Sequence, residues 1–83
     1  MSADQWLEAK EAVTDNGDLS QALELHVQGH VSGSEIFGWS FSYCHSHPVQ
    51  TDEFLDRFRT CGVSCIEGFH AELAELCIGT RRS

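Results

Sequence analysis

Four aromatic residues stand at every second position in the middle of the chain: Phe37, Trp39, Phe41 and Tyr43. Successive side chains of a β-strand point to opposite faces of the sheet, so on a strand all four rings would share one face. A chain of 83 residues buries only about 60% of the surface of its unfolded state, so each large ring counts heavily in its core. The alternation therefore predicts that the rest of the chain is organised around these rings.

Residues 22–47 are predicted to form one antiparallel β-hairpin. Because a shift of one residue moves every side chain of a strand to the other face, the length of the connecting loop decides which residues are buried together. A three-residue loop places the aliphatic residues of the first arm on the aromatic face, whereas a two-residue turn places them opposite. We expect that three-residue loop, residues 32–34, or a β-bulge at Gly29 or Gly38.

Helices are predicted on both sides of the hairpin. Residues 2–13 carry apolar side chains at helical spacing, and Asn16 and Gly17 mark the turn that ends this helix. Thr51 is expected to cap a second helix, because two acidic residues follow it in the first turn. Together these elements predict a single α+β domain, residues 1–83, whose helices pack on the aromatic face of the sheet.

The C-terminal part of the chain allows two interpretations. Apolar residues recur at helical spacing over residues 54–77, but Gly62 interrupts the pattern. Either the helix breaks or kinks there, or residues 63–67 form a third short strand. Gly79 is the expected end of the last helix, and residues 78–83 are expected to be a mobile tail that carries two arginines.

The charge of the chain is its clearest bulk property. Thirteen Asp and Glu residues stand against five Lys and Arg residues, which gives a formal net charge of −8 at pH 7. Such a surface repels nucleic acid and anionic membranes and attracts basic protein surfaces. Solubility alone is the other explanation of this charge. Seven carboxylates lie near the predicted helix starts and loops, where we expect them to form an anionic patch that binds a partner: Glu8, Glu11, Asp15, Asp18, Asp52, Glu53 and Asp56.

These observations predict a non-enzymatic protein-interaction module with a basic protein as its partner. A basic groove that normally holds a phosphate backbone would accept an anionic patch, which makes an inhibitor of a nucleic-acid-binding protein the most specific form of the hypothesis. Small acidic inhibitors of bacterial defence nucleases, anti-CRISPR proteins among them, are similar in composition, although no motif ties the chain to one of their families. A homodimer is also compatible with a two-stranded sheet, because its edges are free.

The alternative function is a small zinc-binding domain. On a strand His45 and His47 would point the same way, and Cys61 and Cys65, one helical turn apart, would complete a tetrahedral site. The spacings C-H-S-H and C-x3-C match none of the common zinc motifs. Both cysteines also lie in the apolar stripe of the predicted helix, where a free cysteine is commonly buried. We therefore expect no cofactor.

An enzyme and a secreted protein are both disfavoured. The sequence contains no phosphate-binding glycine loop, no nucleophile elbow and no C-x-x-C redox motif. No apolar run reaches the roughly 18 residues of a membrane span, and the first residues lack the apolar centre of a signal peptide. The four cysteines are therefore expected to be reduced thiols in a cytoplasmic protein.

Overall fold

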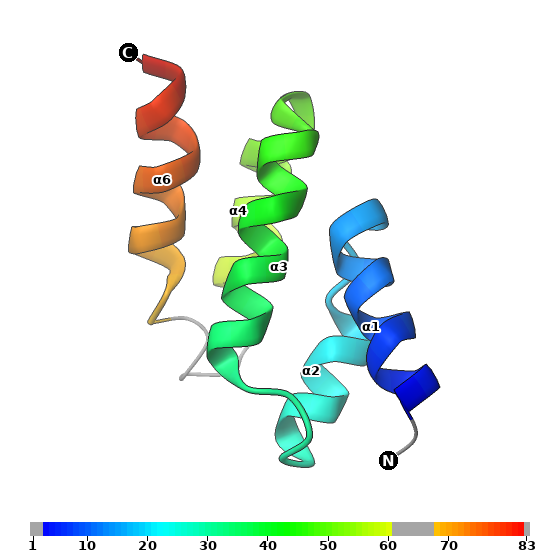
Figure 1. Ribbon diagram of the computed structural model, residues 1–83. Coiled ribbons are helices and arrows are strands. Elements are labelled where there is room, and N and C mark those ends of the chain that lie inside the picture. Colours follow the sequence, from blue (N-terminus) through cyan, green and yellow to red (C-terminus); the bar gives the residue numbers. More distant parts are fainter. Residues whose placement is uncertain (1–2, 61–67, 83) are drawn as a thin grey trace.

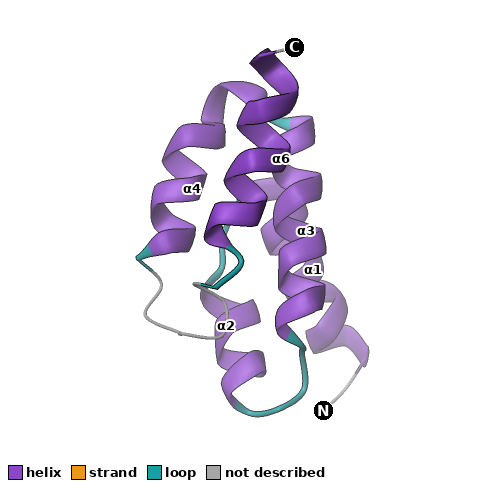
Figure 2. Cartoon of the chain, turned by 90° about the vertical axis from the view of Figure 1, so that its left-hand side faces the viewer, coloured by secondary structure: helices purple, strands orange, loops and turns teal. Residues whose placement is uncertain are grey.

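The chain folds into a bundle of helices. A computed structural model describes residues 3–60 and 68–82, and Figures 1 and 2 show only helices and connecting loops in these two ranges. No strand occurs among the described residues, so the predicted α+β class and the β-hairpin are wrong. The elements are α1 (Ala3–Asn16), α2 (Ser20–Val27), α3 (Gly33–Ser46), the 3-10 helix η1 (Pro48–Gln50), α4 (Thr51–Arg59) and α6 (His70–Arg82).

Helix α3 is the centre of this arrangement. It packs against α1, α4 and α6, while α2 packs against α1 and lies beneath the bundle (Figure 1). Successive α-helices run in alternating directions, and α3 and α6 therefore run parallel to each other (Figures 1 and 2). Short connections join α1 to α2 and α3 to α4, as is usual for antiparallel neighbours in helical bundles.

Helix α2 ends in a cap formed by Gly29, one of the two glycines at which a β-bulge was predicted. Gly29 has a φ of 86°, a left-handed conformation that glycine adopts without steric cost. Its N–H donates to the carbonyl of His26 at 3.0 Å, and the N–H of His30 donates to the carbonyl of Leu25 at 2.9 Å. These two bonds form a Schellman motif, which satisfies carbonyl groups at the end of a helix.

Helix α3 begins in a capping box at the position predicted for the hairpin loop. The Ser32 hydroxyl oxygen accepts a hydrogen bond from the Glu35 N–H at 3.1 Å, and Oε1 of Glu35 accepts one from the Ser32 N–H at 3.3 Å. Oε2 of Glu35 also accepts a bond from Nε1 of Trp6 at 2.9 Å, which ties the start of α3 to α1. Residues 32–34 therefore begin a helix, and the predicted three-residue loop is wrong.

The four aromatic residues of α3 do not share a face. Residues two positions apart in an α-helix differ by about 200° in direction, so the rings separate into two pairs. Trp39 and Tyr43 are buried, and Trp39 meets the Trp6 ring edge-on at a centroid distance of 5.4 Å. Phe37 is half-buried, whereas Phe41 remains 37% exposed. The expected single aromatic face is therefore wrong.

The core lies between α3 and the helices around it. Its largest fully buried side chains are Phe54 and Phe58 of α4, Ile36 of α3, Leu73 of α6 and Val13 of α1. Burying such a side chain stabilises a fold by about 1.5–3 kcal/mol relative to leaving it in water. The apolar residues of α4 recur at helical spacing, so this part of the sequence pattern is confirmed.

The first helix and its end follow the prediction. Helix α1 includes residues 3–13 of the predicted helix and continues by three residues to Asn16. The chain then turns at Gly17, which has a φ of 67° and whose N–H donates to the carbonyl of Val13 at 3.0 Å. Gly17 is buried, and a Cβ atom added to it would lie 2.7 Å from Cζ of Tyr43. Only glycine satisfies both constraints.

Thr51 does not cap α4. It is the first residue of that helix, and its hydroxyl lies 3.2 Å from the carbonyl oxygens of both Cys44 and His47. The hydroxyl thus donates to the carbonyl end of α3, while η1 (Pro48–Gln50) provides the turn before α4. Thr51 is almost completely buried, so this bond joins two helices inside the core.

The break in the C-terminal pattern is present, but its details lie outside the described residues. Helix α4 ends at Arg59 and α6 begins at His70. Both alternatives for residues 63–67 fall in the undescribed range 61–67. Helix α6 continues through Gly79 to Arg82, so the predicted end at Gly79 is wrong, and residues 78–82 of the predicted tail are helical.

Substitution of Gly17 tests the close approach of the α1–α2 turn to Tyr43. Gly17→Ala combines a strained left-handed backbone with a clash against the ring, and we expect it to lower the free energy of unfolding by about 2–4 kcal/mol. Gly29→Ala is the matched control, because its φ is also positive but its Cβ would meet no atom within 4 Å. Urea titrations of both variants should show the larger loss at Gly17, and equal losses would contradict the clash.

Acid should weaken the contact between α1 and α3. The bond from Trp6, together with bonds from Ser32, holds the pKa of Glu35 below its ordinary value. The unfolded chain then takes up this proton at a higher pH than the folded chain. The stability that ionised Glu35 contributes is therefore complete at pH 7 and is lost as the pH falls through its folded-state pKa.

The Glu35→Gln variant isolates this charge, because glutamine still serves a capping box. We expect it to be about 1 kcal/mol less stable than the natural chain at pH 7 and equally stable at about pH 2. Urea unfolding at the two pH values measures both differences. A stability difference that is the same at both pH values would show that the charge of Glu35 is not involved.

Candidate functional site

Acidic side chains of α1 form a line on its exposed face. Their positions are separated by four, three and four residues, and this spacing returns to the same side of an α-helix. The buried residues of α1, Ala9 and Val13, lie on the opposite side, so the line faces away from the core. We call this line the acidic stripe; it consists of Asp4, Glu8, Glu11 and Asp15, all exposed.

The charge of the acidic stripe is not neutralised by neighbouring bases. Lys10 is the one base in α1, and its ammonium group lies 5.5 Å from the centroid of the Trp6 ring, on the flank of the helix that faces α3. Within residues 3–60 and 68–82, the one ion pair joins Arg59 to Asp56 in α4 at 2.6 Å. The carboxylates of the stripe therefore face solvent without an ion pair among the described residues.

The seven carboxylates predicted as a patch lie in three places. Three of them, Glu8, Glu11 and Asp15, belong to the acidic stripe, and Asp18 lies in the turn between α1 and α2. The remaining three, Asp52, Glu53 and Asp56, lie in the exposed positions of α4. These three groups of carboxylates lie on different elements, and both α1 and α4 pack against α3. That all seven carboxylates form one anionic patch stays a prediction.

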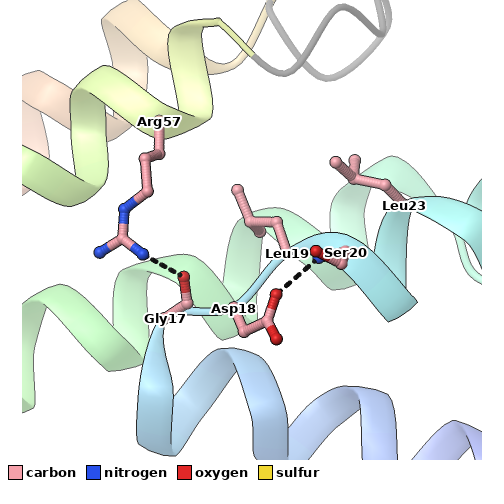
Figure 3. A pocket seen from close by; sticks show the side chains of 6 residues that line it. All are labelled: Gly17, Asp18, Leu19, Ser20, Leu23 and Arg57. Carbon is pink, nitrogen blue, oxygen red and sulfur yellow. Dashed lines mark hydrogen bonds between the residues drawn. The ribbon is translucent and has the colours of Figure 1, made fainter.

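A groove lies between the α1–α2 turn and α4 (Figure 3). Its volume is about 310 Å³, at the lower end of the range for small-molecule sites. We call it the Arg57 groove; it is lined by Gly17, Asp18, Leu19, Ser20, Leu23 and Arg57.

Two opposite charges line the Arg57 groove. Nη1 of Arg57 donates to the carbonyl oxygen of Gly17 at 3.3 Å, and the guanidinium lies 5.9 Å from the centroid of the Phe54 ring. Oδ1 of Asp18 accepts a bond from the N–H of Ser20 at 3.0 Å. Hydrogen bonds from Ser20 and, to a smaller extent, the charge of Arg57 hold the pKa of Asp18 below its ordinary value. Asp18 is therefore ionised at neutral pH.

The two histidines that were predicted as zinc ligands, His45 and His47, stack on different aromatic rings. His45 lies in the last turn of α3, where its exposed ring stacks on Phe41 at a centroid distance of 6.1 Å. The His47 ring instead stacks on Tyr43 at 4.4 Å, and its Nδ1 lies 3.1 Å from the Tyr43 carbonyl oxygen. The two histidines end a helix, so the strand geometry that would have aligned them is absent.

The cysteines add no metal site to the described part of the chain. Cys61 and Cys65, the other two predicted ligands, lie outside the described residues. Cys44 is buried in α3 and Cys77 is half-buried in α6. No three His, Cys, Asp or Glu side chains within residues 3–60 and 68–82 come close enough together to hold a metal ion.

Sequence reasoning missed two features of these surfaces. Asp4 extends the acidic stripe by one turn, and its signal was the four-residue spacing to Glu8. The Arg57 groove had no local signal, because Arg57 and Gly17 are 40 positions apart and meet only in the folded chain. Tertiary contacts of this kind cannot be read from helical spacing.

Comparisons with known proteins give no guide to function. No protein-family model, curated protein or solved structure matches the chain. In the described part of the chain, no helix combines the length and the apolar composition that crossing a membrane requires. The function has to be inferred from the two surfaces described above.

Proposed function

We propose that the protein is a non-enzymatic interaction module that binds the basic surface of a partner protein through its acidic stripe. The observation that carries this proposal is the alignment of Asp4, Glu8, Glu11 and Asp15 on the exposed face of one helix, without an ion pair among the described residues. A row of like charges on one side attracts a complementary row, and this attraction accelerates and orients the encounter of two proteins.

The geometry of the acidic stripe supports a rigid binding element. Four carboxylates are distributed over residues 4–15, a length of about 16 Å at the rise of an α-helix. Helix α1 is fixed to α3 by the bond between Trp6 and Glu35 and by the edge-on contact between Trp6 and Trp39. The backbone that carries the charges is therefore ordered before a partner arrives, which lowers the entropic cost of binding.

In its most specific form, the proposal names a nucleic-acid-binding groove as the surface of the partner that the acidic stripe binds. The acidic stripe has one charge per roughly 5 Å, whereas one strand of a DNA duplex has one phosphate per about 3.4 Å of axis. The two densities are of the same order, so the stripe matches a basic groove over about five base pairs. The protein would then act as an inhibitor, because it and the nucleic acid compete for the same groove.

Solubility is the explanation against which the proposal has to be tested. Exposed carboxylates elsewhere, such as Glu24, Glu72 and Glu75, already contribute to the charge of the surface. If only net charge matters, neutralising these residues is equivalent to neutralising the stripe. If the stripe is a binding surface, the position of the lost charges decides the effect.

Two variants of equal net charge make this comparison. Glu8→Gln, Glu11→Gln and Asp15→Asn are combined in one variant, and Glu24→Gln, Glu72→Gln and Glu75→Gln in the control. The affinity of each for an arginine-rich DNA-binding peptide is measured by fluorescence anisotropy at low and moderate salt. We expect the Kd of the stripe variant to rise about tenfold and that of the control to rise less than about threefold.

The same assay tests the inhibitory form of the proposal. A short DNA duplex added to the complex should displace the natural chain, and higher salt should weaken the complex. Equal losses of affinity in the stripe variant and the control would mean that net charge alone is responsible. Affinity that does not change with salt would contradict an electrostatic interface altogether.

A further inference from the structure

The Arg57 groove holds two opposite charges that are not paired with each other. Asp18 and Arg57 line the same groove (Figure 3), but among the described residues no ion pair joins their side chains within 4.0 Å. Unpaired opposite charges at a groove leave room for a ligand that carries both signs. In such a complex Asp18 and Arg57 would each form an ion pair with the group of opposite charge on the ligand.

The guanidinium of Arg57 is held in place and keeps donors available. One of its five N–H groups donates to the Gly17 carbonyl, and the planar group lies near the Phe54 ring. These contacts fix a side chain that would otherwise lose rotamer entropy on binding. The remaining N–H groups match the two oxygens of a carboxylate, which a guanidinium can bind through two parallel hydrogen bonds.

Asp18 presents the complementary group. Its Oδ1 accepts a hydrogen bond from the N–H of Ser20, and the hydroxyl of Ser20 also contributes a hydrogen bond to the carboxylate. These contacts keep the carboxylate ionised, and a carboxylate has about four acceptor positions, so Asp18 can also accept a hydrogen bond from an ammonium group. Gly17 fixes the turn that carries Asp18, since its backbone tolerates no side chain there.

The rest of the groove is apolar. In Figure 3 the Leu19 side chain lies between Arg57 and Leu23, and Leu23 lies at the end of the groove away from the guanidinium. Leu19 is buried and Leu23 is half-buried, so together they offer a partly covered apolar floor to a small side chain. A ligand with a charged head and an apolar tail would be accommodated along this groove.

We propose that the Arg57 groove binds a free α-amino acid with an apolar side chain. The ligand carboxylate pairs with Arg57, its ammonium group pairs with Asp18, and its side chain lies on Leu19 and Leu23. A simple carboxylic acid meets the negative charge of Asp18 and of a chain with a net charge of −8, and a simple amine meets Arg57. Only a zwitterion satisfies both groups. This inference uses none of the residues of the acidic stripe and is independent of it.

Titration with leucine, followed in amide NMR spectra of the ¹⁵N-labelled protein, tests the groove. We expect leucine to shift the amides of Gly17, Asp18, Ser20 and Leu23, with a Kd of about 1–10 mM, as suits a small ligand in an open groove. Leucinamide lacks the carboxylate and N-acetylleucine lacks the ammonium group. Each should bind at least about fivefold more weakly than leucine, a difference of about 1 kcal/mol.

Three variants locate the two contacts. Arg57→Gln should lose leucine binding, whereas Arg59→Gln, an exposed arginine outside the groove, should retain it. If Arg57→Gln does not fold, Asp18→Asn decides, because asparagine still accepts the bond from Ser20. Asp18→Asn should bind leucine and N-acetylleucine equally well. The inference is overturned if leucine binds no more tightly than its two derivatives, or if a folded Arg57→Gln variant or Asp18→Asn binds like the natural chain.

Discussion

The structure depends on the position of one carboxylate. Glu35 accepts hydrogen bonds from Ser32 at the start of α3 and from Trp6 of α1, so one side chain both begins the central helix and fixes its neighbour. With α3 begun at this point, Trp39 and Tyr43 turn into the core and the remaining helices pack around them. The exposed face of α1 follows from the same contact, because Trp6 directs the opposite side of that helix towards α3.

The helices in which apolar residues recur every three or four positions could be predicted from the sequence. Helix α1, its end at Gly17 and the apolar face of α4 follow from that spacing and from glycine chemistry. The helical structure of the centre of the chain was not predicted, because the spacing of its aromatic rings is compatible with both a strand and a helix. Trp39 and Tyr43 are four positions apart, so a helix buries this pair as well as a strand would.

Local cap signals decide between the two periods. Gly29 is suited to end one helix, and Ser32 followed three positions later by Glu35 is the signature that begins another. The segment that forms α3 also contains a single β-branched residue, Ile36, whereas strands are enriched in such residues. These signals were present in the sequence, and they outweigh the aromatic alternation because they satisfy backbone groups that a helix end would leave unpaired.

The two candidate surfaces differ in how far the sequence predicts them. The carboxylates of α1 share a face because of local spacing, so Glu8, Glu11 and Asp15 could be named in advance. The Arg57 groove depends on a contact between α4 and the end of α1, which only the folded chain provides. The zinc hypothesis assumed that His45 and His47 point the same way on a strand. These residues lie instead at the end of α3, so this basis for the hypothesis is absent.

The most direct test of this account is the backbone conformation of residues 33–46 in solution. ¹³Cα chemical shifts of the assigned protein distinguish a helix from a strand, residue by residue. We expect shifts above the random-coil values throughout α3, beginning after Ser32. Shifts below those values from Phe37 to Tyr43 would show an extended segment instead, and they would contradict the capping box, the buried Trp39–Tyr43 pair and the surfaces built on them.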